Sequence, residues 1–240
     1  MNCLSNLNVK IFADGANLAE MCDLYRKPGV SGFTTNPTLM RKAGINDYER
    51  FAKEALAAIP DRPISFEVFS DEFEEMERQA LKIASWGSNV FVKVPVTNTR
   101  AESANKLICR LSGRGVQLNV TALMTLNQVI EVSRAMNSGP AGYISVFAGR
   151  IADTGRDPVP VMRDALKVLE PCGSIELIWA SPREVLNVFQ ADAIGCHVIT
   201  ATRDILDKLH IIGKPLEEYS LETVKMFRDD AVKAGFRIDC

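Results

Sequence analysis

The chain has 240 residues, of which 47% are hydrophobic and 24% are charged, and its formal net charge is −2. Basic and acidic residues are interspersed, so the sequence has no cationic footprint for binding nucleic acid or an anionic membrane. The length suits one α/β domain over residues 1–240 and is short for two domains.

Eight short apolar runs, several of them rich in Val, Ile or Phe, predict eight β-strands. Amphipathic stretches lie between the runs, and in residues 71–86 Phe73, Met76, Ala80 and Ile83 recur at helical spacing. The predicted strands are residues 9–13, 32–34, 64–68, 90–94, 116–120, 143–147, 176–180 and 196–200. The other predicted helices are residues 100–111, 126–136, 159–169 and 183–191.

Strands that alternate with helices predict a parallel sheet, and eight right-handed crossovers close naturally into a single (β/α)8 TIM barrel. An open doubly wound sheet is the alternative, but it usually has a glycine-rich turn after its first strand. Here residues 13–17 read Ala-Asp-Gly-Ala-Asn and lack that pattern. A final amphipathic stretch predicts an extra C-terminal helix at about residues 220–237, which is a candidate for packing on a neighbouring subunit.

The six cysteines form no C-x-x-C pair, and only two histidines are present, so the sequence offers no zinc pattern. We therefore expect free thiols, no metal site and a reducing, cytoplasmic location. No apolar stretch is long enough to span a membrane, and residues 1–9 lack the features of a signal peptide. The cysteines are Cys3, Cys22, Cys109, Cys172, Cys196 and Cys240.

Catalytic groups in a closed parallel barrel lie at the carboxyl ends of the strands. Lys93 is the most informative residue at these ends, because it lies inside the apolar run of residues 90–96. Burial disfavours a charged ammonium and leaves more free amine, which is the nucleophile for carbonyl substrates. The alternative is an edge-strand lysine whose side chain reaches out to water.

Two carboxylates also lie at predicted strand ends. Asp14 closes the first strand, where it could instead cap the following helix. Glu67 lies within an apolar run, and a buried carboxylate should be either paired or catalytic.

Arg150, Ser181 and Arg183 follow the sixth and seventh predicted strands. Barrels commonly hold a phosphate near their last strands, and arginine recognises such an oxyanion through two hydrogen bonds. Surface salt bridges are the alternative role for each arginine.

Five elements of the sequence resemble the transaldolase family. Residues 91–97 (Phe-Val-Lys-Val-Pro-Val-Thr) resemble its Schiff-base lysine strand, and residues 32–37 (Gly-Phe-Thr-Thr-Asn-Pro) resemble its Thr-Thr-Asn-Pro motif. Residues 144–151 (Ile-Ser-Val-Phe-Ala-Gly-Arg-Ile) resemble its sixth-strand motif, and residues 180–183 (Ala-Ser-Pro-Arg) resemble its Ala-Ser-x-Arg element. Asp14 stands where the family keeps an acid/base aspartate. The elements follow the family's order, and the length resembles the short subfamily that includes fructose-6-phosphate aldolases.

The resemblance implies a role for each candidate residue. Lys93 would be the nucleophile, Asp14 the acid/base group, and Glu67 with Thr121 would hold a proton-shuttling water. The implied substrate-binding residues are Thr34, Asn36, Asn119, Ser145 and Phe147, and the implied phosphate-binding residues are Arg150, Ser181 and Arg183. The resemblance further implies sugar-phosphate substrates of the pentose phosphate pathway, no cofactor, and a homo-oligomer, either a pentamer or a decamer.

Two positions separate activities within this family. The transaldolase branch keeps a glutamate on the third strand and a phenylalanine on the sixth, where aldolase-type members carry glutamine and tyrosine. Glu67 and Phe147 therefore imply transfer of a dihydroxyacetone unit rather than its release. Val146, Ala148 and Pro182 depart from the family pattern around the anion site.

Three alternative functions stay open from the sequence. The first is a fructose-6-phosphate aldolase that releases free dihydroxyacetone, and the second is a transaldolase that acts on a sulfonated ketose. The third is a barrel that binds sugar phosphates without catalysis.

Overall fold

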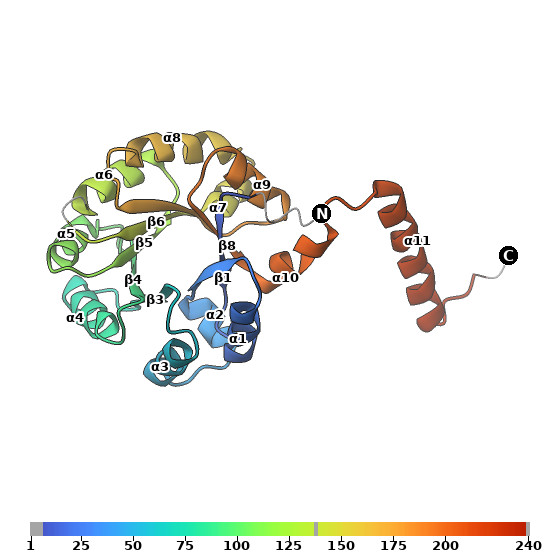
Figure 1. The fold of residues 1–240 in the computed structure, drawn as a ribbon, viewed down its shortest axis with the longest axis horizontal. Helices are drawn as coiled ribbons and strands as arrows, with labels where there is room; N and C mark the ends of the chain where they lie inside the picture. The colour runs from blue at the N-terminus through green and yellow to red at the C-terminus, as the bar shows by residue number, and fades with distance from the viewer. Residues whose placement is uncertain (1–6, 137–138, 239–240) are drawn as a thin grey trace.

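The computed structural model describes residues 7–136 and 139–238, and its strands close into a parallel barrel in the order β1 to β8. The helices lie around the outside of this barrel (Figure 1). The predicted TIM barrel with an extra C-terminal helix is therefore confirmed. The strands are β1 Lys10–Asp14, β2 Val30–Thr34, β3 Ile64–Glu67, β4 Val90–Pro95, β5 Leu118–Leu123, β6 Gly142–Val146, β7 Ile175–Trp179 and β8 Val198–Thr202.

A helix follows each strand, and extra helices lie after β2, β6 and β8. Predicted helices 126–136 and 159–169 match α6 and α8 at both ends. The helices are α1 Leu18–Arg26, α2 Pro37–Lys42, α3 Tyr48–Ala58, α4 Phe73–Ala84, α5 Asn105–Gly113, α6 Leu126–Met136, α7 Ala148–Asp153, α8 Val159–Leu169, α9 Leu186–Ala193, α10 Arg203–Leu206, the 3₁₀ helix η2 Asp207–Ile211, and α11 Leu216–Lys233.

Two strands end at least two residues later than their apolar runs predict. Strand β5 continues to Leu123, which pairs with Val146, and β8 continues to Thr202, which pairs with Asp14. Hydrogen bonding to neighbouring strands, rather than apolar character alone, sets where a strand ends. Thr121 therefore lies inside a strand.

Helix α5 begins at Asn105, so the prediction of a helix over residues 100–111 is wrong at its start. Ala101 has a φ of +61°, which no α-helix accommodates, and Thr97 forms a β-bridge with Ser103.

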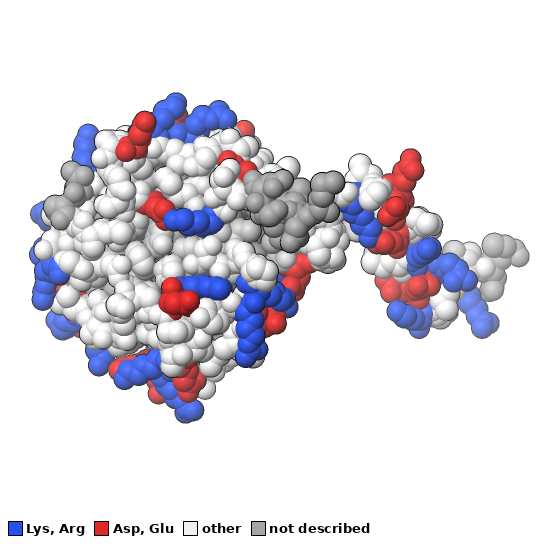
Figure 2. All heavy atoms as spheres, in the orientation of Figure 1, with Lys and Arg blue, Asp and Glu red and all other residues white. Residues whose placement is uncertain are grey.

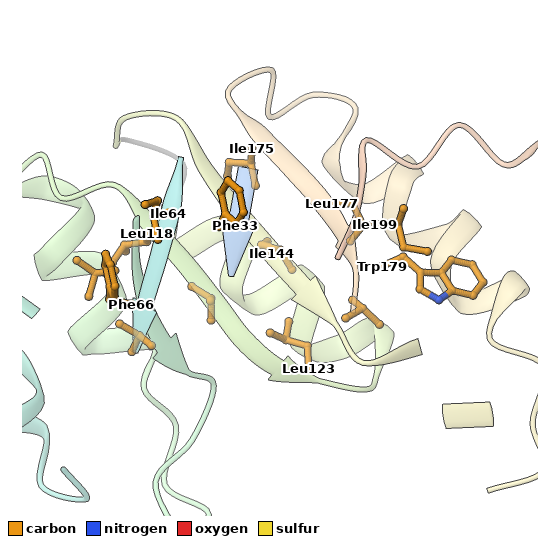
Figure 3. Packing of buried hydrophobic residues seen from close by; sticks show 14 of the residues in the cluster. Phe33, Ile64, Phe66, Leu118, Leu123, Ile144, Ile175, Leu177, Trp179 and Ile199 are labelled. Carbon is orange, nitrogen blue, oxygen red and sulfur yellow. The ribbon is translucent and has the colours of Figure 1, made fainter. Parts of the chain in front are cut away.

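The outward-facing strand residues form the main apolar core with the surrounding helices. Phe33, Phe66 and Trp179 are fully buried in it, and Figure 3 shows Trp179 beside Ile199, its partner on β8. Complete burial of such a side chain stabilises the fold by about 1.5–3 kcal/mol. Because side chains alternate along a strand, every second residue points into the barrel.

The amino-terminal end of the barrel interior is plugged by a second apolar cluster of Phe12, Phe91, Tyr143, Ile178 and Val198. The ring centroids of Phe12 and Tyr143 lie 5.5 Å apart in an edge-to-face contact. One interior step further along β1, β4, β6 and β8, polar residues replace these apolar ones, whereas Ile178 of β7 is followed by Ala180, a member of the same cluster. The polar residues are Asp14, Lys93, Ser145 and Thr200. Because the apolar cluster fills the amino-terminal end of the barrel interior, these polar side chains lie towards its carboxyl end.

Helix α11 stands away from the barrel (Figure 1), and none of its residues is buried. It spans Leu216–Lys233, so the predicted bounds of 220–237 are wrong at both ends. Pro215, with φ −57°, precedes its first turn. Figure 2 shows charges of both signs on this helix and over the same face of the barrel. Its large exposed apolar residues include Leu221, Val224, Phe227 and Val232.

The residues that the structure describes include no helix long and apolar enough to cross a membrane. Cys22, Cys109, Cys172 and Cys196 are free thiols, as expected. Cys3 and Cys240 lie outside the described residues.

Gly32 tests the packing of the interior plug. A Cβ atom at this position would lie 2.6 Å from the Phe12 ring, so Gly32→Ala should lower the free energy of unfolding by about 1–3 kcal/mol, measured by denaturant titration. Gly113→Ala is the control, because a Cβ atom at this position would meet no atom within 4 Å. Gly113 lies in helix α5, and alanine has a higher helix propensity than glycine. Equal stability of the two variants would contradict this packing.

Candidate functional site

A cavity of about 620 Å³ opens at the carboxyl end of the barrel. Its lining includes every predicted site residue except Asn119: Asp14, Thr34, Asn36, Glu67, Lys93, Thr121, Ser145, Phe147, Arg150, Ser181 and Arg183. A cavity of similar size, about 640 Å³, borders Lys10, Leu24 and Leu209 near the start of β1. We place the candidate site in the first cavity, because only there do the interior polar residues of several strands converge.

Lys93 lies on β4 and points into this cavity, with only 5% of its surface exposed. Its Nζ donates a hydrogen bond to the carbonyl oxygen of Thr35 at 3.0 Å and lies 3.4 Å from Oε2 of Glu67. Strand register explains the second contact, since Lys93 pairs with Glu67 across β4 and β3. A closed barrel has no edge strand, so the alternative of an edge lysine reaching to outer solvent is wrong.

Asp14 ends β1 and faces the same cavity. Its Oδ1 accepts a hydrogen bond of 2.7 Å from Thr34 Oγ1, which lies 2.6 Å from Thr200 Oγ1. Burial raises the pKa of Asp14, although the positive charge of Lys93 and the Thr34 hydrogen bond act in the opposite direction. Asn17 caps helix α1 through its side chain, so the alternative cap role for Asp14 is wrong.

Glu67 ends β3, and its side chain is 18% exposed. Burial raises its pKa against the opposing effect of Lys93, and the negative charge of Asp14 raises it further. The cavity thus holds one lysine and two carboxyl groups that burial makes easier to protonate. Carboxyl groups with raised pKa values in a cleft are suited to proton transfer, as acceptors when ionised and as donors when protonated.

Asn119 lies beneath the cavity floor and is fully buried. Its Nδ2 donates to Ser65 Oγ at 2.9 Å, and its Oδ1 accepts a hydrogen bond of 2.7 Å from Ser145 Oγ. Because Ser145 lines the cavity and Asn119 does not, we infer that Asn119 orients the Ser145 hydroxyl from below.

Thr121 presents an unpaired polar group to the cavity. Its Oγ1 is buried and, within the described part of the chain, has no hydrogen-bond partner. The next residue, Ala122, has a φ of +66°, and the register of β5 with β6 shifts between Val120 and Leu123. Such an irregularity re-aims side chains next to sites, and a buried hydroxyl without a partner invites a water or substrate oxygen.

Arg150, Ser181 and Arg183 gather at one side of the cavity mouth. The Arg150 guanidinium lies over the Phe147 ring, 5.8 Å from its centroid, and forms no ion pair with any described carboxylate. Ser181 has a φ of +59°, an unusual value for a residue with a side chain. Arg183 is paired with Asp153 and so forms the salt bridge that the sequence left open as an alternative.

Sequence reasoning missed several residues that line the cavity. Lys42 closes α2, and no described carboxylate pairs with it. Thr202 and Asp204 line the cavity beyond the point where the eighth strand was expected to end. Continuing the alternation from Thr200 by one step would have identified Thr202.

No group of three or more His, Cys, Asp or Glu side chains in residues 7–136 and 139–238 is arranged to hold a metal ion. The chemistry available from these residues is amine attack on a carbonyl, proton transfer by carboxyl groups, and binding of an anionic group.

Comparison with known sequences gives matches along nearly the whole chain. A sequence model of the family described as "Transaldolase/Fructose-6-phosphate aldolase" matches residues 11–238. A "Probable transaldolase" of Thermoanaerobacter sp. (strain X514) is 34% identical over 231 residues, covering 96% of this chain and all of that protein. A "Probable transaldolase" of Dehalococcoides mccartyi is also 34% identical, over 88% of this chain and 93% of that protein.

Solved structures give a match in fold. The crystal structure of dihydrodipicolinate synthase from Rhodopseudomonas palustris superposes with a TM-score of 0.62 at 12% identity, covering 94% of this chain and 80% of that one. At this identity the similarity supports the barrel fold alone.

The raised pKa of Asp14 predicts a stability difference that depends on pH. Above its ordinary pKa of 3.8, the unfolded chain releases this proton more readily than the folded protein. Stability therefore falls as the pH rises from 3.8 through the raised pKa of the folded state. Asp14→Asn removes this loss and should be more stable than wild type at pH 7, measured by denaturant titration across the pH range.

The two proteins should converge in stability well below pH 3.8, where Asp14 is protonated in both the folded and the unfolded state. Glu67→Gln should also be more stable than wild type at pH 7, because burial raises the pKa of Glu67 as well. An Asp14→Asn variant that is less stable than wild type at pH 7 would contradict the assigned electrostatics.

Proposed function

We propose a function from the premise that this chain belongs to the transaldolase and fructose-6-phosphate aldolase family, in which its named relatives are transaldolase-type enzymes. In this proposal it transfers a dihydroxyacetone unit from a ketose phosphate, such as fructose 6-phosphate or sedoheptulose 7-phosphate, to an aldose phosphate. The observation that carries it is a buried lysine amine facing two carboxyl groups of raised pKa in one cavity.

The first step forms the Schiff base. The Lys93 amine attacks the ketone carbon of the donor, and the carbinolamine loses water to give an iminium. A water held between Glu67 and Thr121 would carry the protons, because Glu67 lies beside the amine and the Thr121 hydroxyl has a free hydrogen-bonding capacity.

The second step breaks a carbon–carbon bond. Asp14 as a carboxylate takes the proton of the C4 hydroxyl, the C3–C4 bond breaks, and its electron pair moves into the iminium to form an enamine. An aldose phosphate leaves, while the three-carbon unit stays bound to Lys93. The enamine carbon then attacks the acceptor aldehyde, Asp14 returns the proton to the new hydroxyl, and hydrolysis frees Lys93. No step requires a metal or an organic cofactor.

The other cavity residues would hold the substrate in place. Thr34, Asn36 and Ser145 present hydroxyl or amide groups to the sugar hydroxyls, and Arg150 with Ser181 and Arg183 binds the phosphate at the mouth. Asn119 acts on the substrate through Ser145. We assign the reaction to sugar-phosphate interconversion in the cytoplasmic pentose phosphate pathway.

Transfer is favoured over release by Glu67 and Phe147, both of which line the cavity. Glu67 stays an acidic group beside Lys93, and Phe147 cannot supply the hydroxyl of a tyrosine to protonate the enamine or activate a water. An enamine that is slow to be protonated survives until an acceptor aldehyde arrives.

We also propose that the chain forms a homo-oligomer, a pentamer or a decamer, in which α11 packs on a neighbouring copy. The helix exposes Val224 at 61% and Phe227 at 64% of their surfaces, and it extends away from its own barrel (Figure 1). Large exposed apolar surfaces of this kind are typical of protein interfaces.

Acceptor dependence tests the transferase. Fructose 6-phosphate should give glyceraldehyde 3-phosphate only when erythrose 4-phosphate is present, in an assay that couples the product to a dehydrogenase. Product formation without the acceptor would identify an aldolase instead. Turnover of a sulfonated ketose in place of a phosphorylated one would show that the anion site binds a sulfonate. The absence of turnover with any donor would favour a barrel that binds sugar phosphates without catalysis.

The oligomer has its own test. Light scattering coupled to size exclusion should give a pentamer or decamer for wild type and a smaller species for the double variant Val224→Asp, Phe227→Asp, because charges on this helix face oppose burial. Lys225→Asp would serve as the control, because it changes the net charge of the same helix by the same amount without replacing an apolar residue. A monomeric wild type would contradict the proposal.

A further inference from the structure

The anion-binding side of the cavity contains an ion pair that binding of the substrate alone does not explain. Arg183 donates from Nε to Oδ1 of Asp153 at 2.9 Å and from Nη2 to Oδ2 of the same carboxylate. Asp153 ends helix α7, whose Arg150 is the other arginine of the cavity mouth. Asp153 itself does not line the cavity.

The geometry of this pair leaves one edge of the guanidinium available. An arginine side chain carries five N–H donors in a rigid fork. Asp153 engages Nε and one N–H of Nη2, so both N–H groups of Nη1 and the second N–H of Nη2 remain. These groups lie on the end of the fork that can bind an oxyanion through two parallel hydrogen bonds.

The backbone around Arg183 is restrained as well. A Cβ atom on Gly149 would lie 1.6 Å from the Ser181 carbonyl oxygen, so α7 and the loop after β7 touch without room for a side chain. The Arg183 N–H donates to Asn187 Oδ1 at 2.7 Å. The Gly149 N–H also donates to the Ala180 carbonyl oxygen. The loop that carries Ser181 and Arg183 is thus held by α7 and, through Asn187, by α9. The Asp153 contact extends this restraint to the guanidinium.

Asp153 remains ionised at neutral pH in this arrangement. The hydrogen bond from Arg183 lowers the pKa of Asp153, and the positive charges of Arg183 and Arg150 lower it further. Both oxygens of the carboxylate are therefore available as hydrogen-bond acceptors for Arg183.

We propose that Asp153 is a positioning residue for the anion site, which holds the Arg183 guanidinium with its free edge toward the phosphate of the substrate. A long arginine side chain otherwise loses its conformational freedom when the anion binds, and pre-ordering removes that cost from binding. Asp153 acts through Arg183 and never contacts the substrate. The inference rests on the proposed function for its substrate class, a sugar phosphate. The effect of Asp153 on anion binding can nevertheless be measured without an assay of turnover.

Equilibrium binding of inorganic phosphate, measured by titration calorimetry, gives the first test. Asp153→Ala should weaken phosphate binding by about three- to tenfold, the cost of ordering one long side chain on binding. If Asp153 acted only as a nearby negative charge, its removal would instead tighten phosphate binding. Tighter or unchanged binding by Asp153→Ala would therefore overturn the proposal, and so would a wild type that binds no phosphate.

The matched control is Glu77→Ala, which removes the carboxylate that Arg110 binds through Nε and Nη2 and that Arg114 also contacts. Glu77 lies outside the cavity lining, so this variant should leave phosphate binding unchanged. Asp153→Glu, which keeps a carboxylate, should recover part of the affinity lost in Asp153→Ala.

Steady-state kinetics supply a second readout. Asp153→Ala should raise KM for fructose 6-phosphate by a similar factor while leaving kcat, and all parameters for unphosphorylated fructose, near wild type. Equal losses with both donors would indicate a general structural role and overturn the proposal. Failure of the proposed function would appear differently, as an absence of turnover in wild type with the phosphate-binding result unaffected.

Discussion

The burial of one lysine beside two carboxyl groups is the constraint on which the rest of the structure depends. Removing these groups from water is costly, and it is tolerable only where each has a partner of opposite charge or a hydrogen bond. Lys93 meets this condition through Glu67 and the Thr35 carbonyl, and Asp14 meets it through Thr34. Burial still raises the pKa values of both carboxyl groups, although Lys93 lowers them. Both groups therefore hold a proton more readily than exposed carboxyl groups do, which suits them to acid/base chemistry.

The barrel makes this arrangement possible because it separates packing from chemistry along each strand. Outward residues build the apolar core with the helices, and interior residues change from an apolar plug to polar groups within one alternation step. Phe91 and Lys93 illustrate this on β4, as do Tyr143 and Ser145 on β6. A rigid floor therefore holds the amine while the loops at the carboxyl end remain free to define the substrate.

Much of the fold and the candidate site could be predicted from the sequence, because both depend on short periodic patterns. The alternation of apolar runs and helices predicted the barrel, and polar residues at the strand ends predicted the cavity lining. The bulge at Ala122 and the left-handed backbone of Ser181 could not be predicted, since neither residue is a glycine whose presence would announce such a turn. The Arg183–Asp153 pair joins two residues that are 30 positions apart in the chain, and no periodic or short sequence motif predicts such a contact.

Reductive trapping on Lys93 tests the central claim most directly. Fructose 6-phosphate would be incubated with the protein, reduced with borohydride, and the modified residue identified by peptide mass spectrometry. The Schiff-base account predicts a reduced three-carbon or ketose adduct on Lys93, its loss in Lys93→Met, and its persistence in Lys42→Met, where the other cavity lysine is removed. An adduct on Lys42 alone, or turnover by wild type without any trapped adduct, would contradict this account.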